Sequence, residues 1–136
     1  MLCTTIGGST MEFERGEIVL IPFPAGDHTS LKTRPAAVVN AREFLDCEGR
    51  LLVAARTSNL AAHANDVSFT IPGWEAAGLL KPSAVTSWLA CCTAAMVRHR
   101  IGRLPAGAMA AVDRCLSRAL GLHAVANEEP LKAEAN

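Results

Sequence analysis

Three side chains in the first half of the chain have the chemistry to bind a phosphate group. Arg34 carries a planar guanidinium that can donate two parallel hydrogen bonds to phosphate oxygens and stays charged at any working pH. Thr57 and Ser58, at the end of an apolar stretch, carry hydroxyls that can hydrogen-bond a phosphate oxygen. A surface ion pair with Asp27 or Glu17 is the structural alternative for Arg34. A role as a cap or turn residue is the alternative for Thr57.

Two further polar residues precede Arg34 in the sequence. His28 lies in a polar loop from 25 to 33, and its titration near neutral pH suits proton transfer. Lys32, at the end of the same loop, can contact a nucleic-acid backbone. A solvated histidine and a solvated lysine are the alternatives. Pro35 favours the start of a strand, so we expect Arg34 to lie where the loop re-enters a sheet.

The spacing of the other reactive residues supports no different chemistry. His63, His99 and His123 are not spaced for a metal site or for a Ser/His/Asp group. The five cysteines are odd in number and show no Cys-x-x-Cys spacing, which argues against a zinc site and a disulfide framework and fits a reducing cytoplasm. We therefore expect no metal site and no cofactor.

The composition fits one soluble domain with no general attraction for nucleic acid. No apolar run approaches the roughly 18 residues that a membrane span requires, so we expect a cytoplasmic protein that does not bind membranes. Thirteen Lys and Arg balance 13 Asp and Glu, so attraction for phosphate must come from a local basic cleft. We expect a flexible leader at 1–10, the domain at 11–121 and a disordered tail at 122–136.

The hydrophobic pattern predicts a mainly β domain with one terminal helix. Short apolar or alternating segments predict strands at 17–23, 36–40, 50–56, 67–71, 83–88 and 94–101. Pro105, apolar residues at helical spacing and Gly121 predict a helix between that proline and that glycine. This set fits a small antiparallel barrel of five to seven strands with the helix packed on it.

Four sequence blocks resemble, in the same order, those of the MazF/PemK family of toxin endoribonucleases. The first is Gly-Glu-Ile-Val-Leu-Ile-Pro-Phe-Pro from Gly16, followed by Lys32-x-Arg34-Pro35. The others are Arg56-Thr57-Ser58, Gly78-Leu-Leu-Lys-Pro-Ser83 and Ile101-Gly102-Arg-Leu104. Together the blocks and the helix after them extend from residue 14 to residue 121, which is most of the chain.

The resemblance implies an SH3-like barrel of the MazF/PemK/CcdB type that forms a homodimer. It implies the toxin of a type II toxin–antitoxin pair, which cleaves single-stranded RNA at specific sequences. Cleavage would need no metal and would proceed by attack of a ribose 2′-hydroxyl on the neighbouring phosphate. By this resemblance Arg34, Thr57 and His28 are catalytic, whereas Lys32 and Ser58 bind substrate. A cognate antitoxin would silence the toxin by laying an acidic segment across the cleft.

Other functions stay open at this stage. After Ser83, where many family members carry acidic or basic active-site residues, the chain continues Ala-Val-Thr-Ser-Trp-Leu-Ala-Cys-Cys. A non-enzymatic toxin that binds a protein such as DNA gyrase, as related CcdB-like barrels do, is therefore one alternative. A catalytically inactive homologue that only binds antitoxin is another, and an SH3-like module with no toxin role is a third.

Overall fold

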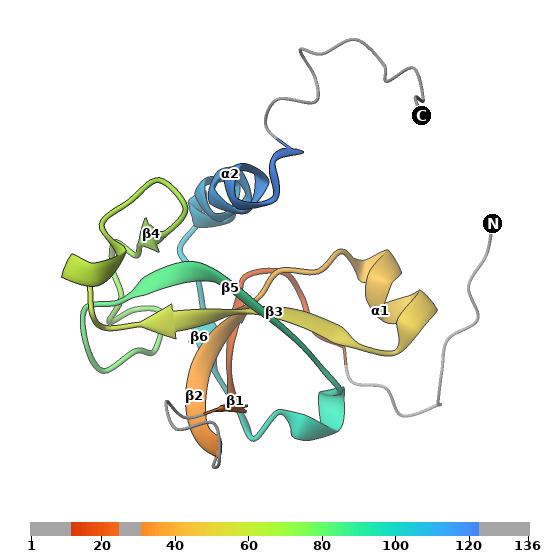
Figure 1. Ribbon diagram of the computed structural model, residues 1–136. Coiled ribbons are helices and arrows are strands. Elements are labelled where there is room, and N and C mark those ends of the chain that lie inside the picture. Colours follow the sequence, from red (N-terminus) through yellow and green to blue (C-terminus); the bar gives the residue numbers. More distant parts are fainter. Residues whose placement is uncertain (1–11, 25–30, 123–136) are drawn as a thin grey trace, which may run out of the picture.

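The computed structural model describes residues 12–24 and 31–122, which form a curled antiparallel sheet and a C-terminal helix (Figure 1). The six strands of the sheet follow the order β4-β5-β3-β2-β1-β6. They are β1 (Glu17–Pro24), β2 (Leu31–Val38), β3 (Leu51–Thr57), β4 (Phe69–Thr70), β5 (Ala84–Cys92) and β6 (His99–Arg103). The helices are α1 (Arg42–Glu48), α2 (Ala108–Leu120) and the short 3₁₀ helices η1 (Ala61–His63) and η2 (Ala94–Met96). The predicted mainly β fold with a terminal helix is confirmed.

The first hairpin is longer than predicted. β2 begins at Leu31 and ends at Val38, whereas the pattern predicted a strand over 36–40. Lys32 and Arg34 therefore lie inside a strand, paired with Phe23 and Ile21 of β1. Pro35 also lies inside β2, but the ladder between β2 and β3 covers only Ala36–Val38. The missing N–H of Pro35 thus falls just beyond the end of that ladder.

Helix α1 occupies a segment for which the sequence predicted only a link. Leu45 is buried and anchors the helix, and Gly49 ends it with a positive φ of 68° and an N–H that donates to Leu45 O at 2.8 Å. Arg42 and Asp46 form an i,i+4 ion pair at 3.3 Å. The residue at the N-cap, Ala41, has no side chain that can cap the helix, so the usual start signal is absent.

Three later strands differ from prediction at their ends. Residues 94–101, predicted as one strand, form η2 and then β6, which extends to Arg103. β4 keeps only Phe69–Thr70 of the predicted 67–71. β5 continues to Cys92 because its last residues pair with Leu51 and Leu52 of β3.

The sheet separates two hydrophobic cores, one on each face. The first core contains Ile18, Ala37, Ala54, Val85 and Val112 among its members. The second core contains a different set of buried residues, including Phe13, Val19, Ala36, Leu45 and Val53. Side chains alternate between the two cores along β1, β2 and β3, as the twofold period of a strand requires.

Helix α2 closes the first core. Ala108 and Val112 are buried there, and Met109 and Leu116 pack against them. Arg15 holds the helix from outside, because its guanidinium bonds both the Asp113 carboxylate and the Val39 carbonyl. The helix ends as predicted at Gly121, whose φ is 77°.

Two observations bear on the expectations about membranes and cysteines. None of the helices in the described part of the chain is long and apolar enough to cross a membrane. Cys91, Cys92 and Cys115 are free thiols, as expected from the cysteine spacing. Cys47 is disulfide-bonded, so the expectation that the cysteines form no disulfides is wrong at this residue.

Candidate functional site

Arg34 and Thr57 lie at the same end of the neighbouring strands β2 and β3, beyond the last paired residues of the ladder between them. The last pairs between these strands join Val38 with Val53 and Ala36 with Ala55. When this register is continued by two residues, Arg34 lies opposite Thr57. Arg34 is also paired with Ile21, whose side chain belongs to the second core. The side chains of Arg34 and Thr57 therefore project from the face of the sheet that carries the second core.

The Arg34 side chain is exposed and is available to a ligand. No carboxylate within the described residues forms an ion pair with it. Glu17, one of its two alternative partners, is only 7% exposed and pairs with Arg100 at 3.4 Å. The other, Asp27, lies outside the described residues. The strand and the following Pro35 hold the backbone of Arg34 in place.

Thr57 has both a structural contact and a free donor. Its Oγ1 accepts the N–H of Asn59 at 3.0 Å, which is the turn contact expected of a threonine at a strand end. A hydroxyl that accepts one hydrogen bond can still donate its own proton. Thr57 can therefore form the turn and bind a phosphate oxygen at the same time, and exposed Ser58 follows as a second hydroxyl.

The two remaining predicted site residues have different outcomes. Lys32 is exposed on β2, two residues from Arg34, and alternation along the strand places both cations on the same face. His28 lies outside the described residues. A second histidine, His99, is brought to this end of the sheet because β6 pairs it with Leu20 of β1, a contact that spacing in the sequence did not indicate.

Arg56 is a cation that sequence reasoning did not assign to the site. Its Nε donates to Ser83 Oγ at 2.9 Å, and the Ser83 hydroxyl donates to Lys81 O at 2.7 Å. Ser83 is 0% exposed, so this anchor is fixed. Burial lowers the pKa of Arg56, and the positive charge of nearby Arg34 lowers it further.

An apolar pocket lies beside Arg56. Its volume is about 360 Å³, and it is lined by Leu20, Pro35, Arg56, Gly78, Leu79, Leu80 and Ile101. The Leu80 side chain is 90% exposed at this pocket. Arg56 is paired with Val85, a member of the first core, so the pocket opens on the face of the sheet opposite to Arg34.

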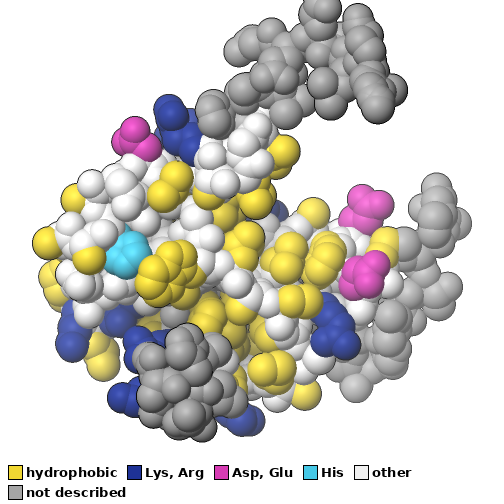
Figure 2. Space-filling view, viewed as in Figure 1, with side chains coloured by type: hydrophobic (Ala, Val, Ile, Leu, Met, Phe, Trp, Pro, Cys, Tyr) yellow, Lys and Arg dark blue, Asp and Glu magenta, His cyan; other side chains and the backbone are white. Residues whose placement is uncertain are grey.

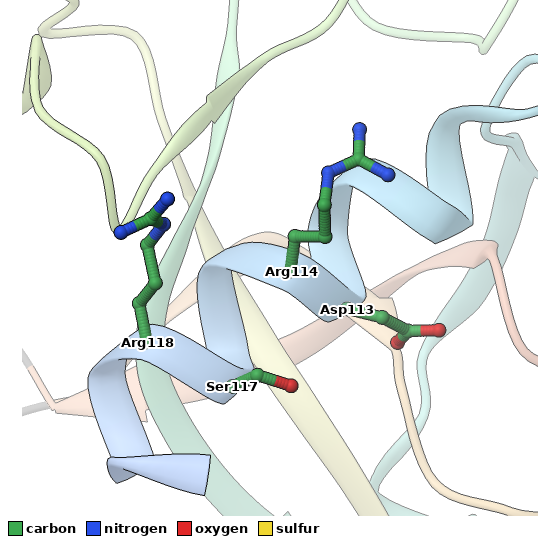
Figure 3. Close-up of a pocket in the computed structure, with 4 residues that line it drawn as sticks. All are labelled: Asp113, Arg114, Ser117 and Arg118. Carbon is green, nitrogen blue, oxygen red and sulfur yellow. The ribbon is translucent and has the colours of Figure 1, made fainter. Parts of the chain in front are cut away.

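A second pocket, on α2, contains none of the predicted site residues. It has a volume of about 300 Å³ and is lined by Asp113, Arg114, Ser117 and Arg118. Arg114 and Arg118 project on one side of the helix, whereas Asp113 and Ser117 project on another (Figure 3). Asp113 already pairs with Arg15, so this pocket has a structural explanation and is not the candidate site.

The geometry at the ends of β2 and β3 therefore supports phosphate binding. It presents a strand-held guanidinium, a hydroxyl donor on the same face and a second guanidinium fixed by a buried serine. Across the described residues, no three His, Cys, Asp or Glu side chains are grouped so that they could hold a metal ion.

The sequence from residue 14 to residue 120 matches the family model of the PemK-like, MazF-like toxins of type II toxin–antitoxin systems. The chain belongs to this toxin family. A search of the curated proteins by sequence found no match.

Solved structures of an endoribonuclease and of MazF toxins share the fold. A mycobacterial endoribonuclease in complex with its cognate antitoxin superposes with a TM-score of 0.64 at 13% identity, over 79% of this chain and 94% of that one. The Mycobacterium tuberculosis toxin MazF-mt6 gives a TM-score of 0.60 at 20% identity, over 78% of this chain and 97% of that one. MazF of Deinococcus radiodurans, in a MazE-MazF crystal form, gives a TM-score of 0.61 at 22% identity, over 80% of this chain and 96% of that one. These similarities establish the MazF fold for this member of the family.

Proposed function

We propose that this MazF/PemK-family toxin is an endoribonuclease that cleaves single-stranded RNA at specific sequences without a metal ion. The observation that carries the proposal is the exposed Arg34, which no described carboxylate neutralises and which lies opposite Thr57 in the strand register. Family membership and the solved endoribonucleases that share its fold support RNA as the substrate.

The proposed reaction is a transfer within the RNA backbone. The ribose 2′-oxygen forms a bond to the neighbouring phosphorus, and the bond from phosphorus to the 5′-oxygen breaks. The products are a cyclic phosphate and a new 5′-hydroxyl end. A base takes the proton of the 2′-hydroxyl and an acid returns one to the leaving oxygen. His28 is our candidate for this proton transfer.

Arg34 and Thr57 would act on the phosphate itself. The guanidinium can bind two non-bridging oxygens and stabilise the negative charge that gathers on them in the transition state. The Thr57 hydroxyl would donate a third hydrogen bond and fix the orientation of the phosphate. Lys32 and Ser58, at the edge of the same site, would bind the neighbouring backbone.

The proposal includes two protein partners in the cytoplasm. One is a cognate antitoxin, because similar solved toxins are in complex with their antitoxins. We expect an acidic segment of the antitoxin to cover the exposed Arg34. A second copy of the chain would cover exposed apolar side chains, among them Trp88 at 68% and Leu89 at 40% exposure. Apolar side chains gather across the middle of the face shown in Figure 2. Such a patch is typical of a surface that is covered by a partner.

Induced expression tests this function directly. Wild type should arrest growth and produce RNA fragments with new 5′-hydroxyl ends, and purified protein should cleave mixed-sequence RNA in the presence of EDTA. Arg34→Ala and Thr57→Ala should lose both effects. Arg50→Ala is the matched control, because Arg50 is an exposed arginine at the opposite end of β3. Intact RNA in cells that arrest would refute the ribonuclease proposal.

One observation favours a second candidate, a toxin that binds a protein target. β5 supplies no carboxylate, histidine, lysine or arginine. Its two central hydroxyls are engaged, because Thr86 donates to Ala55 O at 2.8 Å and Ser87 donates to Val67 O at 2.7 Å. Growth arrest that persists in Arg34→Ala and is accompanied by DNA damage would favour a target such as gyrase. A variant series with no growth effect at all would favour a homologue that only binds antitoxin.

A further inference from the structure

Arg56 differs from the other arginines that form contacts in this domain. Arg15, Arg42, Arg100 and Arg103 each form an ion pair with a carboxylate. Arg56 is half-buried, yet its only hydrogen bond within the described residues is to the neutral hydroxyl of Ser83. A partly buried guanidinium that has no counter-charge among the described residues would be stabilised by a bound anion.

The anchor on Ser83 leaves most of the guanidinium free for a ligand. A guanidinium has five N–H donors, and Ser83 uses the single one on Nε. The four donors on the two terminal nitrogens form no hydrogen bond with any other described residue. Because Ser83 is 0% exposed and bonded to Lys81 O, the guanidinium has a fixed direction before any ligand arrives. This is the preorganisation that a phosphate-binding arginine requires.

The position of Arg56 relates it to the site at Arg34. Continuing the strand register places Pro35 opposite Arg56, directly beside the pair of Arg34 and Thr57. Arg34 projects from the face of the second core and Arg56 from the face of the first, at the same end of neighbouring strands. The two cations therefore lie on either side of one strand end.

We propose that Arg56 binds the RNA phosphate next to the one held by Arg34, and that Ser83 is a positioning residue which directs the Arg56 guanidinium toward that phosphate. This inference rests on the proposed ribonuclease function and extends it to a second phosphate. An RNA strand that passes over the ends of β2 and β3 would then cross from one face of the sheet to the other. The open pocket of about 360 Å³ beside Arg56 leaves room for the strand on that side.

Salt-dependent binding of an RNA that cannot be cleaved tests the inference. The probe is a randomised 12-mer with 2′-O-methyl riboses, measured by fluorescence anisotropy at several salt concentrations. The logarithm of the binding constant falls linearly with the logarithm of salt concentration. Loss of one phosphate contact on a single strand makes this slope shallower by about 0.7, which corresponds to about fivefold weaker binding at 0.1 M salt. Arg56→Met should show this change and Arg56→Lys a smaller one. Arg50→Met, the exposed-arginine control, should match wild type.

The role of Ser83 is tested by combining variants. Ser83→Ala should weaken binding in the wild-type background and raise KM more than it lowers kcat for cleavage. In the Arg56→Met background it should have no further effect on binding, since it acts through Arg56. A thermal melt of each variant shows that the domain is folded. A further loss of binding in the double variant would overturn the positioning role.

The outcomes separate this inference from the function on which it rests. If wild type binds RNA and Arg34→Ala weakens binding, while Arg56→Met keeps the wild-type slope, Arg56 does not contact phosphate and the inference is wrong. If folded wild type neither binds the probe nor cleaves mixed-sequence RNA, the ribonuclease proposal fails, and the second phosphate contact fails with it.

Discussion

Gly102→Ala is expected to destabilise the domain strongly, because Gly102 has no room for a side chain. Gly102 lies in β6, paired with Ile18 of β1, and faces the turn at 72–78. A Cβ added there would lie 2.2 Å from Ala77 O and 2.8 Å from Ala77 C. Both atoms belong to the backbone, so the clash is relieved only if the turn or the strand moves.

The expected loss in free energy of unfolding follows from overpacking. Added methyl groups in packed interiors typically destabilise by about 1–3 kcal/mol, and a backbone contact this short places Gly102→Ala at about 3 kcal/mol. Each kcal/mol shifts the Tm of a domain of this size by roughly 4 °C, so the Tm of Gly102→Ala should be about 12 °C below that of wild type. Gly78, in the same contact, has a Cβ position only 2.6 Å from Ile101 O, which indicates that the two segments interlock.

Thermal and urea unfolding of Gly102→Ala and of a matched control provide the assay. Gly73→Ala is the control because a Cβ there meets nothing within 4 Å, although the φ of 68° makes alanine unfavourable by about 1 kcal/mol. The predicted order of stability is wild type, then Gly73→Ala, then Gly102→Ala. If Gly102→Ala is at least as stable as Gly73→Ala, the close approach of the two backbones does not exist in solution.

Alkaline pH should destabilise the fold through its partly buried thiols. Burial raises the pKa of Cys92 and of Cys115, so the unfolded state loses these protons first and the free energy of unfolding falls as pH rises above about 8.5. Urea midpoints measured between pH 7 and 10 should show this fall in wild type and a smaller one in the Cys92→Ala, Cys115→Ala double variant; equal slopes would contradict it. Arg100→Met should destabilise by about 1–3 kcal/mol, because it leaves the nearly buried Glu17 carboxylate without its partner. Adding Glu17→Gln should restore part of that loss in the same urea titrations, and no restoration would show that Arg100 acts by packing alone.

Residue patterns predicted the fold class because the strands alternate or are wholly apolar. They failed where tertiary contacts outweigh local signals. The pattern placed Lys32 in a loop and Arg34 where that loop re-enters the sheet, yet both pair with β1, at Phe23 and Ile21, and the hairpin extends through them. Helix α1 has no capping side chain at its start, and its stability comes from burial of Leu45 in the second core.

The candidate site was predictable only in part, for a related reason. Arg34 and Thr57 each lie within a recognisable block, and continuing the register of β2 and β3 beyond Ala36 and Ala55 places them opposite each other. Arg56 precedes Thr57 in the same block, but its interest depends on a hydrogen bond to Ser83, 27 residues later. Nothing local indicates that this half-buried arginine has no carboxylate partner among the residues that the structure describes. That property emerges only when the sheet has formed.

The division of the domain into two cores has a consequence for its local dynamics. β3 supplies side chains to both, Leu51 and Val53 to one and Leu52 and Ala54 to the other, whereas α2 contributes only to the first. Amide protons of β3 should therefore exchange only by global unfolding, while those of α2 can exchange by detachment of the helix. Because Arg34 projects from the opposite face, such an opening would leave its surroundings folded. A protein that binds α2 and one that binds at Arg34 can thus act on separately mobile parts of the same small domain.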